Sequence, residues 1–317
     1  MIDLKGMVEM ALFGRKSGRD DKGVPATEAI AKRAPHALAR LSEDFTIGAL
    51  ETALLKDFPA EDAEGWDRTG LLVGEPALPV RKMALALDPT VAAIEEAASR
   101  GANVLITHHP AYLGAPDDFR PASSAALSSG AAVWAAVRNQ VALMCFHTAL
   151  DVSLRAARVL PGMLGLSFKG QFVEQTGSSQ RRGYGQICDV PPVDDAPETL
   201  GRLASRCTAV FGRQPRVWGD FSKPVRRAAT ATGSAGTLGR SCLALDIDCL
   251  VCGEIKYHEA LDVSQAGLGV IELGHDVSEL PLVAVLADAV VRLGVPQDKI
   301  VVLDQGGNWA YPEAVRV

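Results

Sequence analysis

Five of the six histidines lie in short clusters that also carry carboxylates and follow apolar, strand-like runs. The clusters are His108-His109, His147 with Asp151, Tyr257-His258-Glu259, and His275 with Glu279. Imidazole and carboxylate groups are common protein ligands of divalent transition metals. Histidines distributed at random would not gather at the ends of apolar runs. The pattern therefore indicates a metal site.

The candidate ligands are too many for one catalytic zinc ion. They comprise three histidines and two carboxylates: His108, His109, Asp151, His275 and Glu279. A pair of divalent ions needs a bridging carboxylate, terminal imidazoles and open positions for water, and this set supplies the protein's share. The alternative is that these side chains are hydrogen-bonded surface groups. A histidine followed four residues later by an acid is common by chance. Zn, Fe, Mn, Co and Ni all suit these ligands, so the sequence does not identify the metal.

Two further histidines are candidates for supporting roles. Either His147 or His258 could orient a metal-ligating side chain by forming a hydrogen bond with the polar atom that does not bind the metal. For His147, direct ligation stays open beside a structural role. Lys256, close to His258, could bind an anionic substrate or transfer a proton, and a solvated charged face is the alternative.

Two βαβ patterns position these clusters. Each consists of a strand, a helix and a strand, at 83–87, 91–100 and 103–107 and again at 227–232, 237–245 and 249–252. The first unit leads into His108 and the second into Glu254. When the units are overlaid, Gly233 falls on Asp88 and Glu254 on His109. The chain therefore contains an internal repeat.

The next step along the chain repeats as well. The apolar run 141–146 precedes His147 and Asp151, and the run 270–273 precedes His275 and Glu279. Both halves thus place a histidine and an acid four residues apart after a strand. Ligands usually collect at the carboxyl ends of parallel strands. We expect an α/β fold of two related halves that contribute to one shared centre.

The domain organisation follows from these patterns. Residues 1–42 are charged and irregular, and we expect them to form an N-terminal extension. Residues 43–165 are expected to form the first α/β half. Residues 166–317 are expected to form the second, intertwined with the first.

Composition limits the class of protein and its partners. The chain has 317 residues, 48% of them hydrophobic, and a formal net charge of -6. The acidic balance disfavours nucleic acid as a partner, and there is no helix-turn-helix or zinc-finger pattern. Asp288 and Arg292 interrupt the apolar stretch 281–295, so we expect no membrane span. The start lacks a secretory signal pattern, which predicts a cytoplasmic protein.

Two other motifs have a structural explanation. Cys249 and Cys252 form a C-x-x-C inside an apolar run, so buried packing is favoured over a redox role. The glycine-rich turn 233–239 could bind a phosphate through backbone N–H groups, but it lacks the lysine of a P-loop. Close packing of helix on strand explains its glycines equally well.

Five motifs, in order, resemble those of the Nif-three-like dinuclear metal-centre family, whose members are often labelled GTP cyclohydrolase 1 type 2 homologs. They are Trp66-Asp67 through Gly74, Ala86-Leu87-Asp88 through His108-His109-Pro110, His147 through Asp151, Gly253 through Ala260, and Gly274 through Glu279. The resemblance spans about residues 45–315. It implies two related α/β halves without a large inserted domain, a homohexamer built as a trimer of dimers, and a two-metal site facing an internal cavity.

Carried over by position, the resemblance places the family's metal ligands on the same five residues found above. Glu279 is then expected to bridge both ions. The chain departs from the usual family pattern at Ala149, where Asn is common, at Tyr257, where a second His is common, and at Asp276, where an aromatic residue or His is common. These departures spare the ligands and affect the substrate pocket.

The chemistry expected of such a centre is metal-dependent hydrolysis of a small molecule. One or both ions would lower the pKa of a bound water, so that hydroxide attacks an electrophilic carbon or phosphorus centre, with Glu279 as the catalytic residue. The family label suggests ring opening of GTP, although the sequence shows no recognisable guanine or triphosphate pocket. The alternative is a non-enzymatic metal-binding oligomer that handles metal or serves as an interaction scaffold.

Overall fold

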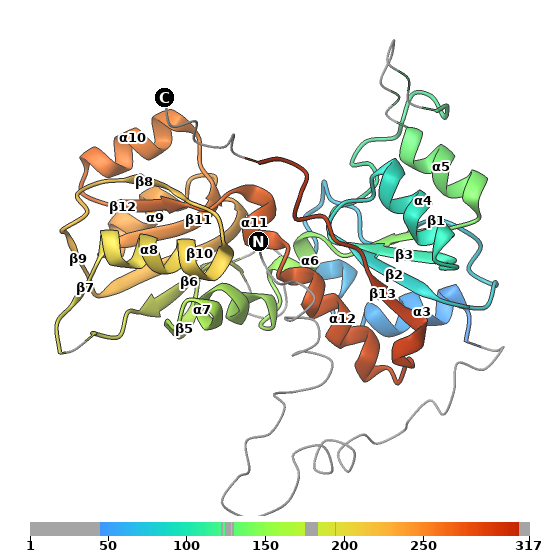
Figure 1. Ribbon diagram of the computed structural model, residues 1–317, viewed down its shortest axis with the longest axis horizontal. Helices are drawn as coiled ribbons and strands as arrows, with labels where there is room; N and C mark the ends of the chain where they lie inside the picture. The colour runs from blue at the N-terminus through green and yellow to red at the C-terminus, as the bar shows by residue number, and fades with distance from the viewer. Residues whose placement is uncertain are drawn as a thin grey trace, which may run out of the picture.

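The computed structural model describes residues 45–310, with gaps at 122, 124–127, 129, 175–182 and 194. The predicted N-terminal extension, 1–42, lies outside the described residues. Two lobes, each built on its own β-sheet, lie side by side (Figure 1).

The first lobe is a five-stranded sheet in the order β1-β4-β3-β2-β13. Its strands are β1 (Gly70–Val73), β2 (Met83–Ala86), β3 (Val104–Thr107), β4 (Ala142–Cys145) and β13 (Ile300–Val302). Only β1 runs antiparallel to its neighbour. Every residue of β2, β3 and β4 is buried, which explains why these strands are continuous apolar runs instead of alternating ones.

Helices cover both faces of this sheet. Helices α4 (Val91–Ser99) and α5 (Ala131–Asn139) pack on one face. Helices α3 (Ile47–Leu54) and α12 (Leu282–Arg292) pack on the other (Figure 1). The α4 helix begins where Thr90 Oγ1 accepts a hydrogen bond from the backbone N–H of Ala93, at 3.1 Å.

The second lobe is a six-stranded sheet in the order β5-β6-β10-β11-β12-β8. Its strands are β5 (Ser167–Glu174), β6 (Gly183–Asp189), β8 (Arg216–Trp218), β10 (Arg227–Ser234), β11 (Cys249–Glu254) and β12 (Gly269–Glu272). Helices α7 (Val159–Met163) and α8 (Leu200–Phe211) pack on one face, and α9 (Leu238–Ala244) and α10 (Tyr257–Gln265) on the other. A short pair, β7 (Glu198–Thr199) with β9 (Pro224–Val225), lies beside α8.

The two sheets repeat one arrangement. The units β2-α4-β3 and β10-α9-β11 are both parallel βαβ units, and a third parallel strand, β4 or β12, lies next to each. That third strand leads into a one-turn helix, α6 (Thr148–Asp151) or α11 (His275–Glu279), and pairs with an antiparallel edge strand, β1 or β8. The predicted α/β fold of two related halves is confirmed.

The end of the described chain returns to the first lobe. Helix α12 follows the second sheet in sequence, yet Leu286 and Val290 pack in the same core as Ile47 and Leu50 of α3. Strand β13 then pairs with β2 in parallel. The chain therefore passes from the first lobe to the second and back.

Helix α8 begins at Leu200, directly after the two residues that pair with β9. Cys249 and Cys252 pack into cores on opposite faces of β11, and burial raises the pKa of both thiols, as expected for packing residues. In the described part of the chain, no helix has the length and apolar character to cross a membrane.

Candidate metal centre

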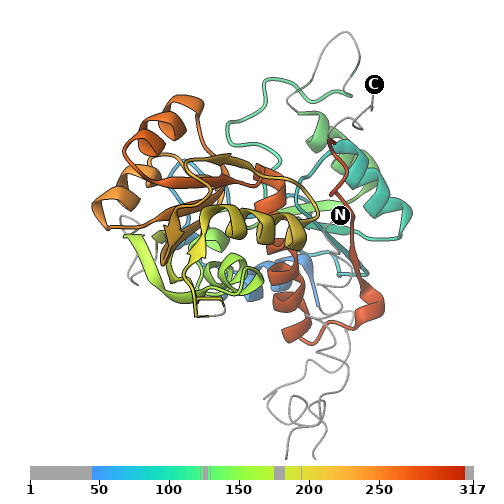
Figure 2. The same ribbon diagram turned by 60° about the vertical axis from the view of Figure 1, so that its left-hand side comes forward.

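The segments after three parallel strands meet where the two lobes face each other. Strand β3 leads into His108 and His109, β4 into α6 with Asp151, and β12 into α11 with His275 and Glu279. Both views show α11 at the junction between the lobes (Figures 1 and 2). All five predicted ligands are thus brought together from far-apart parts of the sequence.

Glu279 lies at the middle of the cluster, with its side chain only 4% exposed. Its Oε1 is 3.6 Å from Nε2 of His108, and its Oε2 is 3.0 Å from Nε2 of both His109 and His275. Asp151 Oδ1 is also 3.6 Å from His108 Nε2. One carboxylate of the second lobe therefore faces imidazoles of both lobes.

Two buried atoms at this centre make no hydrogen bond within the described residues: His108 Nε2 and Glu279 Oε2. The short distances from Glu279 Oε2 to His109 and His275 do not have hydrogen-bond geometry. Leaving a buried polar atom unsatisfied costs about 1–3 kcal/mol, so an orphaned pair calls for a missing partner. A divalent cation is a partner that both a carboxylate oxygen and an imidazole nitrogen accept. The residues present therefore fit a metal site.

The donor atoms form three overlapping groups, within each of which they lie no more than 4.8 Å apart. The groups are His108 with His109 and His147, His109 with His275 and Glu279, and His108 with Asp151 and Glu279. Each could hold a metal ion.

Every imidazole of the cluster has a protein partner at Nδ1. The four pairs are His108 with the Phe146 carbonyl (3.2 Å), His109 with Asp88 (2.7 Å), His147 with Asp67 (2.9 Å) and His275 with Glu254 (3.0 Å). A partner at Nδ1 fixes the ring and leaves Nε2 to bind a metal, which is the usual arrangement around metal-binding histidines.

The carboxylates favour protonated imidazoles. Burial lowers the pKa of His109, but the nearby carboxylates of Asp88 and Glu279 outweigh burial and raise that pKa to about 10. The Glu279 carboxylate, 3.0 Å from His275 Nε2, is the largest cause that raises the pKa of His275 to about 9. Burial disfavours the charged form of Glu279, yet the charge on His108 and its neighbours holds the pKa of Glu279 well below its usual range. A bound cation would replace these protons as the counter-charge.

Gly233, near the end of β10, lets the backbone of this strand lie close to Glu279 of α11. Its φ is +57°, and a Cβ there would lie 2.1 Å from Glu279 Oε1. The Gly233 N–H donates to Ser278 Oγ at 2.9 Å, which ties this strand to α11. Gly233 therefore serves close packing around the candidate metal centre.

Comparison with known proteins assigns the family. The model of the Duf34/NIF3 (NGG1p interacting factor 3) family matches residues 45–304. The chain belongs to this family. Among curated relatives, the GTP cyclohydrolase 1 type 2 homolog of Streptomyces coelicolor is 31% identical over 249 residues, which is 77% of this chain and 83% of that one. The homolog of the same name from Clostridium perfringens is 26% identical, over 73% of this chain and 86% of that one.

Solved structures of Duf34/NIF3 relatives share the fold. Staphylococcus aureus protein SA1388 superposes with a TM-score of 0.74 at 21% identity, covering 84% of this chain and 99% of that one. A Bacillus cereus protein related to NIF3 gives a TM-score of 0.68 at 20% identity, covering 83% and 97%. Among the described residues, every strand belongs to one of the two lobe sheets or to the short β7–β9 pair, so the expected absence of a large inserted domain is confirmed.

The supporting residues predicted from sequence separate into two places. The His147 ring lies 5.2 Å from that of His108 and 5.5 Å from that of His109, centroid to centroid. Lys256 and His258 are exposed at the start of α10. Neither belongs to any of the metal-capable groups found in the described residues. The structure thus brings His147 to the centre, and its supporting role stays a prediction, with direct ligation as the alternative.

Three carboxylates of the centre were missed as functional residues: Asp67, Asp88 and Glu254. Asp67 accepts hydrogen bonds from the His147 ring and from the backbone N–H of Thr148 at 2.9 Å, so it also fixes the start of α6. Asp67 and Asp88 lie in connecting segments beside predicted strands, and Glu254 is the last residue of β11. When the two βαβ units are overlaid, Asp88 aligns with Gly233. This alignment was the feature of the sequence that could have revealed Asp88 as a residue of the centre.

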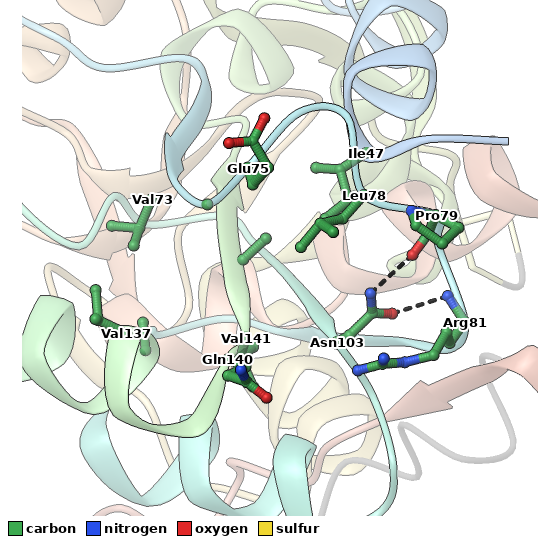
Figure 3. Close-up of a pocket in the computed structure, with 13 residues that line it drawn as sticks. Ile47, Val73, Glu75, Leu78, Pro79, Arg81, Asn103, Val137, Gln140 and Val141 are labelled. Carbon is green, nitrogen blue, oxygen red and sulfur yellow. Dashed lines mark hydrogen bonds between the residues drawn. The ribbon is translucent and has the colours of Figure 1, made fainter. Parts of the chain in front are cut away.

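A hollow on the first lobe is distinct from this centre (Figure 3). It measures about 380 Å³, and its apolar lining includes Leu78 and Val137. The Asn103 amide is turned back to the chain: its Nδ2 donates to the Pro79 carbonyl (2.9 Å) and its Oδ1 accepts from the Arg81 N–H (2.8 Å). None of the predicted ligands is among the described residues that line it.

Proposed function

We propose that the chain is a hydrolase that uses two divalent metal ions, bridged by Glu279. The observation that carries the proposal is the position of this carboxylate. Its Oε1 faces His108, which also faces Asp151, whereas its Oε2 faces His109 and His275. The two oxygens therefore belong to two different ligand groups, as a bridging carboxylate requires.

The protein's own contribution is to hold these groups in place before a substrate arrives. Bound divalent ions would supply Lewis acidity and a more acidic water for hydrolysis. Asp88 and Glu254 accept the Nδ1 protons of His109 and His275, so that each ring presents Nε2 to the centre. The absence of a side chain at Gly233 leaves the space that the carboxylate of Glu279 occupies.

The substrate we propose to test first is GTP, because the curated relatives are named GTP cyclohydrolase 1 type 2 homologs. We also propose that the protein assembles as a homohexamer, a trimer of dimers, on the basis of the family resemblance. The native mass of the purified protein checks that assembly.

Replacing Glu279 with Gln tests the function. The amide keeps the shape of the side chain but removes the charge that two cations share. We expect Glu279→Gln to lose at least one of two ions per chain and to hydrolyse its substrate at least about 100-fold more slowly, since even groups that only support a ligand cost about 10- to 100-fold. Elemental analysis gives the metal content, and a screen of GTP, phosphoesters and cyclic amides with metal-loaded protein gives turnover.

Glu198→Gln is the matched control. Glu198 is also a buried glutamate, 2% exposed, but it pairs with Arg202 and Arg206 beside α8. Its variant should keep metal content and activity. If Glu279→Gln kept the metal content and the hydrolytic activity of the wild type, the proposed mechanism would be wrong. Metal-loaded wild type that turns over none of the screened compounds would instead support the non-enzymatic metal-binding alternative.

A further inference from the structure

We propose that a pocket beside His275 binds a neutral, planar heterocycle that carries N–H groups, with Trp309 as its stacking surface. This inference rests on the proposed function, because the pocket shares residues with the metal centre. The pocket measures about 450 Å³, which is within the usual range for small-molecule sites.

The pocket lies directly against the candidate ligands. His275 and Glu254 both line it. His275 turns Nε2 toward Glu279, at 3.0 Å, and Nδ1 toward Glu254, also at 3.0 Å. A molecule in the pocket therefore lies next to His275, a candidate metal ligand. A substrate of the metal centre must bind at such a position.

Trp309 is held rigidly at the wall of this pocket. Its Nε1 donates to Asp276 Oδ1 at 3.1 Å. The guanidinium of Arg213 lies over the indole, 4.0 Å from the ring centroid, and also donates to Asp276 Oδ2 at 3.2 Å. The residue is nevertheless 40% exposed. A fixed, accessible aromatic surface favours stacking, because little side-chain freedom is lost when a ligand binds.

The charges around the pocket are compensated. Glu272 accepts from Arg216, with Nε at 3.0 Å, and Asp276 accepts from Arg213 at 3.2 Å. Glu254 pairs with His275. Paired carboxylates do not require a charged ligand, but their oxygens can accept further hydrogen bonds. A flat aromatic wall with acceptor oxygens around it matches a neutral heterocycle with N–H or amino donors better than an aliphatic or an anionic ligand.

Guanosine is the probe that tests this inference. It has a flat ring with N–H donors and lacks the phosphates that would bind metal ions directly. Calorimetric titration of the metal-loaded full chain should detect guanosine binding and no binding of ribose. Trp309→Leu should weaken guanosine binding about 5- to 150-fold, the range that loss of one stacked base gives. Trp309→Phe should retain most of the affinity.

Trp134→Leu is the matched control. Trp134 is 41% exposed, on α5 in the first lobe, and its variant should bind guanosine as the wild type does. Equal affinity of Trp309→Leu and wild type, or absence of guanosine binding to wild type, would overturn the inference. So would loss of metal from Trp309→Leu, which would make Trp309 a support of the centre. Metal content and hydrolysis measured on the same samples show whether the proposed function survives such a failure.

Discussion

At the residue scale, the orientation of each imidazole depends on the group behind it. His109 is held by Asp88 at 2.7 Å, and this acceptor obliges the ring to carry its proton on Nδ1. In Asp88→Asn, the amide can donate to Nδ1 instead, which moves the proton to Nε2 and blocks ligation there. We expect the apparent metal affinity to fall about 10- to 100-fold, measured by competition with a chromogenic chelator.

The control for this change is Asp117→Asn, an exposed aspartate in the loop that follows β3. It removes the same charge from the same lobe without touching a histidine, so its metal affinity should equal that of the wild type. Equal affinities for the Asp88 variant and the wild type would mean that Asp88 does not set the tautomer of His109.

Residue types and spacing predicted the five ligand candidates but not the groups behind them. The candidate ligands lie in the segments that follow apolar strands, so a pattern of strand and histidine reveals them in the sequence. Asp67 binds a histidine 80 positions away, and Glu254 binds one 21 positions away. Such pairings depend on how the strands are arranged in space, and a carboxylate in a turn has no spacing that reveals its partner.

At the element scale, the glycines at the end of β10 and in the turn that follows determine how closely this backbone approaches Glu279 of α11. An alanine at Gly233 would place a carbon 2.1 Å from Glu279 Oε1 and would also adopt φ of +57°. Gly236, in the turn that follows β10, has φ of +51° and nothing within 4 Å of an added Cβ. We expect Gly236→Ala to lose only about 1–2 kcal/mol of unfolding free energy, the cost of the left-handed backbone.

Gly233→Ala should lose more unfolding free energy than Gly236→Ala and should also lose metal, because its methyl group must displace Glu279. Chemical denaturation and elemental analysis of the two variants side by side separate the backbone cost from the steric one. If both variants kept the same stability and the same metal content, close packing on Glu279 would not be the reason for glycine at 233.

The elements around the repeat were predictable, whereas three of the four edge strands of the two large sheets were not. The βαβ units match their predicted ranges to within two residues, because buried parallel strands and an amphipathic helix have clear patterns. Strands β5, β8 and β13 were not predicted. Each lies at the edge of a sheet, and β8 and β13 are only three residues long, so they have little periodicity. The pairing of Ile300 with Met83 also joins distant parts of the chain.

At the scale of the whole molecule, the candidate ligands join the two lobes. His108, His109 and Asp151 come from the first lobe, and His275 and Glu279 from the second. A metal ion held between them binds only the folded arrangement, so it should stabilise the native state of both lobes. By mass action, free metal at about 100 times its dissociation constant adds about 2.7 kcal/mol to the unfolding free energy.

Removing metal with a chelator should therefore lower the melting temperature of the wild type, measured by scanning calorimetry. Because α12 and β13 return to the first lobe after the second sheet is complete, the two lobes should respond together in one transition. Glu279→Gln, which lacks the carboxylate shared between the lobes, should melt at nearly the same temperature with and without the chelator. A wild-type melting temperature unchanged by complete metal removal would show that metal does not bind preferentially to the folded arrangement of these residues.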